Sequence, residues 1–203
     1  SKASTPPNDT TKPASLPRRV PWTTSHVKGT PEPPPPYRTN RLFPKLGFKN
    51  PVVISFAPGS KRIFVGDQAG KVWSFPNDPA VEKADLVLDV KEIIKTNPGN
   101  ERVKGVDALY GLTFHPDFAR NRFCYVCYVV NGEGRGPDKR LADGTRVSRF
   151  KVTDTEPPRC IPESEQIVIS WLQGGHNGGC LHFGPQDGCL YISTGDGGFA
   201  NPP

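Results

Sequence analysis

The sequence of 203 residues contains no methionine and no run of about twenty consecutive apolar residues. Because a helix needs a run of that length to cross a bilayer, we expect no membrane span in this chain. The sequence would show the same lack of a long apolar run if a signal peptide had been removed. The start at Ser1 also fits a processed N-terminus.

The sequence also lacks the patterns that mark nucleic-acid-binding proteins. The 26 basic residues exceed the 20 acidic residues and give a net charge of +6. These basic residues are scattered, with no basic helix and no aromatic RNA-binding pattern among them. We interpret the charge as a solubility property and predict no nucleic-acid partner.

Cysteine is scarce, and its spacing argues against a bound metal or haem. A c-type haem needs Cys-x-x-Cys-His, but Tyr128 follows the pair Cys124 and Cys127. On a strand, residues three apart point to opposite faces, so this pair is also a poor zinc or dithiol site. We predict no metal ligands here, and either buried thiols or one or two disulfides. The five cysteines are Cys124, Cys127, Cys160, Cys180 and Cys189.

Proline divides the chain near residue 40. Eleven of the 24 prolines lie in the first 44 residues, whereas nearly all the glycines come later. The segment Pro31 to Tyr37 reads PEPPPPY and favours polyproline II, because so polar a segment buries too little apolar surface to offset the entropy of ordering. We predict a Pro-rich irregular arm at residues 1–41 and a folded domain at residues 42–203.

A repeated pattern in the second part predicts an all-β fold. Phe-x-Pro occurs at Phe56, Phe114 and Phe183, about 60 residues apart, and each copy lies between two short apolar strands. This unit of strand, turn and strand suits the blades of a β-propeller. Further strands are expected at the residues 71–75, 146–152 and 166–171. The chain therefore holds portions of about three blades.

The stretch from Gly174 to Gly198 has the composition of a site. It reads GGHNGGCLHFGPQDGCLYISTGDGG, in which alternating apolar residues predict a hairpin with the turn GPQDG. His176 precedes the first strand and Asp196 follows the second, so the hairpin brings both to one end of the sheet. A carboxylate there can orient the imidazole, choose its tautomer and raise its basicity.

Two other polar residues have simpler interpretations. His115 lies in a Phe-His-Pro-Asp turn, where we expect it to hydrogen-bond the backbone. Asp67 lies in the segment VGDQAGKV and is typical of a turn aspartate. Neither is predicted to be catalytic.

The glycine-rich stretch resembles the glucose/sorbosone dehydrogenase family, the quinoprotein sugar dehydrogenases of the soluble glucose and aldose dehydrogenase type. The family has a similar His, Asn/Gln, Gly run, then Gly-Pro-Asp-Gly, then Gly-Asp. A second match is LYGLTFHPDF at Leu109 to Phe118, where the family has a Leu-Leu-Gly-Leu-Ala-Phe-His-Pro-Asp-Phe string. The two motifs occur in the same order, and the resemblance extends from about Leu42 to the C-terminus.

The resemblance implies a six-bladed propeller, of which this chain would supply the N-terminal half, with the remaining blades in a missing C-terminal part. It implies oxidation of a sugar or related alcohol by pyrroloquinoline quinone (PQQ). His176 would be the general base, Asp196 would orient it, and His176, Asn177 and Gly178 would contact the cofactor. Calcium is also expected, with ligands outside this chain. A periplasmic or secreted location and a cytochrome electron acceptor follow from the same analogy.

One departure from the family concerns the substrate. The family has a polar Glu or Gln before the Leu-Gly string, whereas this sequence has Val106 at the equivalent position. Asp107 is the neighbouring candidate for a substrate contact, although a strand reverses face with each residue. The identity of the sugar or alcohol is therefore left open.

The alternative is a non-catalytic secreted propeller that serves as a binding or assembly module. Propellers carry many functions, so the fold alone does not decide between them. The hedgehog-interacting proteins have a related propeller without relying on this chemistry.

Overall fold

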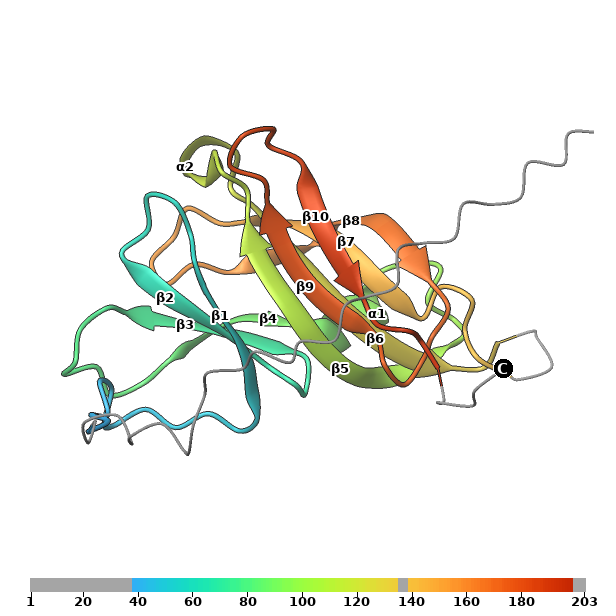
Figure 1. Ribbon diagram of the computed structural model, residues 1–203, viewed down its shortest axis with the longest axis horizontal. Helices are drawn as coiled ribbons and strands as arrows, with labels where there is room; N and C mark the ends of the chain where they lie inside the picture. Colours follow the sequence, from blue (N-terminus) through green and yellow to red (C-terminus); the bar gives the residue numbers. More distant parts are fainter. Residues whose placement is uncertain (1–37, 135–138, 199–203) are drawn as a thin grey trace, which may run out of the picture. The chain divides into compact units, whose positions relative to one another are not determined.

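The computed structural model describes residues 38–134 and 139–198 (Figure 1). The chain divides into two units, Ser1–Asn40 and Arg41–Pro203, and the second holds nearly all the described residues. The predicted Pro-rich arm lies outside the described residues except for its last four positions, 38–41. All the described helices and strands belong to the second unit.

Strands dominate the second unit, and its two helices are short. Within the described ranges, neither helix is long and apolar enough to cross a bilayer. The elements are β1 (Pro51–Phe56), β2 (Arg62–Asp67), β3 (Lys71–Pro76), β4 (Asp85–Asp89), α1 (Val90–Thr96), β5 (Val103–Phe114), α2 (Phe118–Asn121), β6 (Phe123–Gly132), β7 (Thr145–Val152), β8 (Cys160–Trp171), β9 (Gly178–Phe183) and β10 (Leu190–Thr194).

The strands form three antiparallel sheets in simple chain order. Strands β1 to β4 make one four-stranded sheet, β5 to β8 make a second, and β9 and β10 pair alone. Four-stranded antiparallel sheets of this kind are the blades of a propeller. The Phe-x-Pro repeat is confirmed as a structural marker, because Phe56, Phe114 and Phe183 each end the first strand of a sheet. The prediction of portions of three blades is confirmed, with two blades holding four strands and the third holding two.

Apolar side chains fill the space between successive sheets. One core cluster joins the first two sheets and includes Phe64, Val72, Leu109 and Phe150. A smaller cluster lies between the second sheet and the β9–β10 pair and includes Leu181. The first strands β1, β5 and β9 lie side by side (Figure 1). Each sheet is therefore held by burial of its face against the next.

The sequence patterns missed β4, α1 and the four-residue α2. Strand β4 is only five residues long, and α1 follows it directly, so neither has the length that makes a periodic pattern visible. Helix α1 begins where the Asp89 carboxylate accepts a hydrogen bond from the Lys91 amide at 3.0 Å. It buries Val90 and Ile93 in the first core cluster.

The two turn residues behave as expected. The Nδ1 atom of His115 accepts a hydrogen bond from the Asp117 amide at 3.0 Å. Asp67 accepts hydrogen bonds from the Lys71 amide at 3.0 Å and from the Trp73 indole at 2.9 Å. Both side chains therefore have structural partners, while their non-catalytic interpretation stays a prediction.

Candidate functional site

The β9–β10 hairpin brings His176 and Asp196 together. In this antiparallel pair Leu181 lies opposite Ile192 and Gly178 lies opposite Thr194. The residues just before β9 and just after β10 therefore meet at one end of the sheet. The Nδ1 atom of His176 lies 3.0 Å from Oδ1 of Asp196. The contact expected from the sequence is present, while the catalytic roles of both residues stay predictions.

Glycines allow the two backbone segments beside this pair to approach closely. A Cβ on Gly195 would lie 2.0 Å from the carbonyl oxygen of His176. Gly178 has a φ of +67°, and its Cβ would lie 2.5 Å from the Gly195 nitrogen. The Gly197 amide also donates a hydrogen bond to the His176 carbonyl at 3.0 Å. These glycines are required by backbone packing that places the histidine and the aspartate.

Gly175 has a different environment. A Cβ on this residue would meet nothing within 4 Å. The backbone next to His176 is therefore open on that side. An external group can approach the main chain there without meeting a side chain of the described residues.

The His176–Asp196 pair has a defined electrostatic arrangement. Hydrogen bonds from the Gly198 amide and then from His176 lower the pKa of the Asp196 carboxyl below its ordinary value. Asp196 is therefore a carboxylate at neutral pH and can accept a hydrogen bond from His176 when Nδ1 carries the ring proton. No hydrogen bond from the described residues reaches Nε2, so that atom is available to accept a proton when Nδ1 carries the ring proton. Both side chains are exposed, at 63% and 69%.

Asn177 is buried and its amide group is used inside the protein. Its Oδ1 atom accepts hydrogen bonds from the Gly174 amide at 3.1 Å and from the Thr145 hydroxyl at 3.0 Å. Its Nδ2 atom donates to the Gly174 carbonyl at 2.7 Å. The side chain closes the turn that leads into His176 and ties that turn to β7. Its predicted contact with a cofactor is not tested by this arrangement.

In the described part of the chain, Asp107 belongs to a different strand, β5, and makes no hydrogen bond with His176 or Asp196. It occupies a bulge in β5, because Val106 pairs with Val130 and Ala108 with Val129, which leaves Asp107 as the extra residue. The simple alternation of faces therefore does not hold at this point. Val106 is half-buried and packs against the first core cluster.

The oxygens of Asp107 have two partners that the sequence did not reveal. One oxygen accepts a hydrogen bond from the Asn131 amide group, and the other accepts one from Gln173 Nε2 at 2.9 Å. Gln173 immediately precedes Gly174. A Cβ added to Gly174 would lie 2.4 Å from the Gly197 carbonyl oxygen, so Gly174 packs closely against the loop after β10. Asp107 is thus linked through Gln173 to the loop that holds the pair. In the sequence, the position of Gln173 next to the glycine run was the feature that could have indicated its place in the site.

The cationic side chain of Arg140 is close to this loop, since its Nη1 atom donates to the Gln173 carbonyl at 3.4 Å. The described residues contain no group of three or more His, Cys, Asp or Glu side chains arranged to hold a metal ion. The chemical groups that meet at this end of the hairpin are the His176 imidazole, the Asp196 carboxylate and the surrounding glycine backbone.

Comparisons with known proteins agree with this architecture. Two relatives are the Hedgehog-interacting proteins of Homo sapiens and Mus musculus. Each is 30% identical to this chain over 158 residues, and the match covers 74% of this chain. The chain spans only 21% of the length of these relatives. Among solved structures, the PQQ-bound aldose sugar dehydrogenase of Streptomyces coelicolor is similar, with a TM-score of 0.50 and 20% identity. That match covers 79% of this chain and 42% of the dehydrogenase and supports the propeller fold.

A sequence model of a single family covers most of the chain. The model described as Glucose / Sorbosone dehydrogenase matches residues 48–203. The matched range includes all three sheets and both residues of the His176–Asp196 pair. The chain, with its two four-stranded blades and the first two strands of a third, belongs to the glucose/sorbosone dehydrogenase family.

Proposed function

We propose that the protein containing this chain is a quinoprotein dehydrogenase that oxidises a sugar or related alcohol by hydride transfer to PQQ. The observation that carries the proposal is the 3.0 Å contact between His176 Nδ1 and Asp196 Oδ1. A carboxylate on one ring nitrogen leaves the other as a general base of fixed orientation. Membership of the family supports alcohol oxidation as the reaction class that we propose for such a base.

His176 acts on the hydroxyl proton of the substrate. Its Nε2 atom accepts this proton as the hydride leaves the adjacent carbon, and the ring becomes an imidazolium. Asp196 remains ionised because its pKa is lowered, so it stabilises the positive ring through Nδ1–H. PQQ, when bound, supplies the two-electron acceptor for the hydride.

The residues around His176 fit a flat polar cofactor. A Cβ on Gly175 would meet nothing within 4 Å, so such a group could approach the main chain beside His176. His176 and the backbone at Gly178 would contact the cofactor. Asn177 would act through the turn that its buried side chain closes. We propose that the calcium ligands and most cationic contacts come from other parts of the protein.

Asp107 is proposed to contact the substrate. Each of its oxygens accepts one hydrogen bond within the protein, from Asn131 or from Gln173. A carboxylate oxygen has two lone pairs, so each can accept a second bond from a sugar hydroxyl. The side chain is exposed on β5, which leaves it accessible.

The cellular setting follows the same proposal. We place the protein in the periplasm or outside the cell, with a cytochrome as the electron acceptor and further blades completing the propeller. These assignments rest on family membership.

A second candidate is a non-catalytic propeller that binds a protein partner. The 30% identity to Hedgehog-interacting protein over 158 residues supports it. On this alternative the histidine and aspartate would be retained as a structural hydrogen bond at the end of the hairpin.

The deciding experiment reconstitutes the full protein with PQQ and calcium. Dye reduction is followed across a panel of aldoses and simple alcohols, and PQQ binding is measured separately by its absorbance. We expect turnover in the wild type and its loss in His176→Ala. The matched control is His182→Ala, an exposed histidine on β9 of the same hairpin, which should retain turnover. A folded protein that neither binds PQQ nor reduces the dye would support the binding module instead.

A further inference from the structure

Two buried cysteines from different strands meet inside the second sheet. The sulfur atoms of Cys124 and Cys160 lie 3.6 Å apart, although the residues are 36 positions apart in the chain. Their exposures are only 2% and 9%, and both belong to the first core cluster. The contact is therefore between two thiols held together by the fold, away from bulk solvent.

The strand pairing explains how the two thiols meet. Cys124 lies on β6 opposite Phe150 of β7, and Cys160 lies on β8 opposite Val152 of β7. Phe150 and Val152 are two residues apart, so all four side chains are on the same face of the sheet. The two cysteines thus reach toward each other across β7.

We propose that Cys124 and Cys160 form a disulfide when the protein folds under oxidising conditions. The sulfurs must approach from 3.6 Å to about 2.0 Å. Cys160 is the first residue of β8, and the β7–β8 register is irregular between Arg149 and Lys151. Closure therefore requires the start of β8 to move, and only the pairs Lys151 with Ile161 and Val152 with Cys160 join this end to β7 beyond the irregularity.

The oxidant in this reaction is a small-molecule disulfide of the glutathione class. The thiolate of one cysteine attacks it, forms a mixed disulfide and releases one small thiol. The thiolate of the second cysteine then attacks the attached sulfur, forms the protein disulfide and releases the second small thiol. The protein loses two hydrogens and two electrons, and the small disulfide is reduced to two thiols.

The timing of the reaction follows from burial. The Cys124 thiol and the surrounding core raise the pKa of Cys160 well above its ordinary value. The thiolate is therefore rare in the folded state, and exchange there is slow. During folding both thiols are accessible, so the bond is expected to close before the core does.

The other three cysteines have no comparable partner. Cys127 is on the same strand as Cys124 but packs on the opposite face, in the cluster with Leu181. Cys180 and Cys189 are exposed, and Cys180 lies beside Ser193 in the hairpin. A metal site is not supported, because no third ligand accompanies Cys124 and Cys160 in the described part of the chain.

The test is refolding of the full protein in a glutathione redox buffer, beside a sample kept in reductant. Circular dichroism establishes that both samples are folded. Each is then denatured, alkylated and digested with trypsin and a glutamate-specific protease, because cleavage after Arg159 and Glu163 separates Cys160 from Cys180 and Cys189. We expect a Cys124–Cys160 cross-linked peptide in the oxidised sample. Three of the five cysteines of this chain should then be alkylated there, and all five in the reduced sample.

Two variants assign the bond. Cys160→Ala should lose the cross-link, whereas Cys127→Ala should keep it and should leave Cys124 as the only cysteine of its peptide. Five alkylated cysteines in a folded oxidised wild type would overturn the proposal, as would a cross-link between other cysteines. If Cys160→Ala does not fold, the peptide maps of the wild type and of Cys127→Ala still show whether Cys124 is bonded to Cys160.

Discussion

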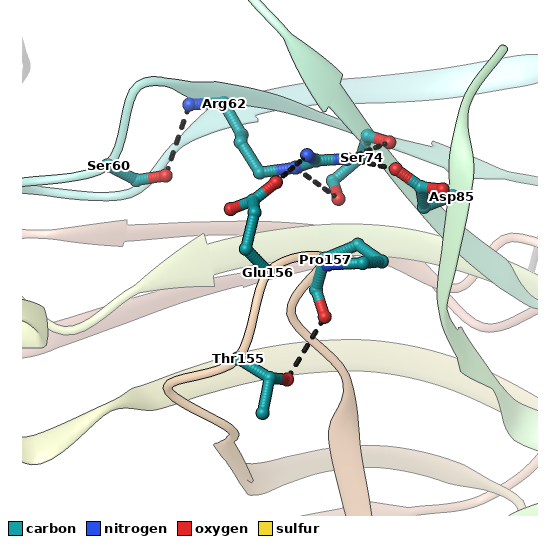
Figure 2. A network of polar contacts seen from close by, with 7 residues as sticks. All are labelled: Ser60, Arg62, Ser74, Asp85, Thr155, Glu156 and Pro157. Carbon is teal, nitrogen blue, oxygen red and sulfur yellow. Dashed lines mark hydrogen bonds and ion pairs between the residues drawn. The ribbon is translucent and has the colours of Figure 1, made fainter.

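The guanidinium of Arg62 on β2 forms an ion pair with Glu156, a residue of the β7–β8 loop in the next sheet (Figure 2). Arg62 is buried at 7% exposure and also pairs with Asp85. Its Nε atom donates to the Ser74 hydroxyl at 3.0 Å, and its Nη2 atom donates to the Ser74 carbonyl at 2.9 Å. One side chain thus satisfies its hydrogen-bonding groups within the first sheet and joins that sheet to the second.

Arg62→Ala should destabilise the protein strongly. The change leaves Asp85 and Ser74 without their buried partner, so we expect the free energy of unfolding to fall by about 3 kcal/mol. Glu156→Gln should cost about 0.5 kcal/mol, because Glu156 is 72% exposed and its ion pair is screened by water. Urea denaturation of the three proteins measures both changes. Equal losses in the two variants would show that Arg62 acts mainly through Glu156.

Substitutions in the His176–Asp196 pair should reduce turnover to different degrees. His176→Ala removes the proposed base and should lower kcat by about 10²-fold to 10⁴-fold. Asp196→Asn keeps the imidazole but replaces the carboxylate that fixes its tautomer, so a smaller loss of about 10-fold to 100-fold is expected. Dye-reduction kinetics of the PQQ-loaded protein measure both. Wild-type kcat in either variant would remove that residue from the mechanism.

The pKa of Asp196 should stay below its ordinary value even without the histidine. The largest cause of the lowered pKa is the hydrogen bond from the Gly198 amide, and His176 comes second. In His176→Ala the pKa should therefore rise only part of the way. Because the folded-state pKa is lowered, the stabilisation from this carboxylate is present above the unfolded pKa and is lost as pH falls through the folded value.

A carbon-detected NMR titration of the Asp196 carboxyl in the wild type and in His176→Ala measures this difference. A full return to the ordinary aspartate value in the variant would show that His176, rather than the Gly198 amide, is the main cause.

Gly178→Ala should disrupt the turn that carries the site. Its φ of +67° is unfavourable for alanine, and the new Cβ would lie 2.5 Å from the Gly195 nitrogen. We expect a loss of about 2 kcal/mol in the free energy of unfolding, together with separation of His176 from Asp196.

Gly175→Ala is the matched control, because its Cβ meets nothing within 4 Å. Thermal unfolding of both variants provides the comparison. A Gly178→Ala protein as stable as the control would show that the Gly178 to Gly195 approach is not a constraint.

The local patterns predicted much of the fold and the central pair of the site. Alternating apolar residues around GPQDG defined the β9–β10 hairpin, and antiparallel pairing then required His176 and Asp196 to meet at one end. The Phe-x-Pro repeat marked the end of each first strand. Such features depend on interactions between residues close in sequence, so they can be recognised without the rest of the fold.

The sequence by itself determined the Phe-x-Pro strand ends, the β9–β10 hairpin and the place of the His176–Asp196 pair, because turn chemistry and side-chain alternation are local. Only the tertiary structure showed the bulge at Asp107, its bond to Gln173, the ion pair between Arg62 and Glu156, and the contact of Cys124 with Cys160. Each of these joins residues from different strands or loops, and their partners depend on how the sheets twist and pack. No local pattern encodes that packing, since it follows from the burial of whole faces against one another.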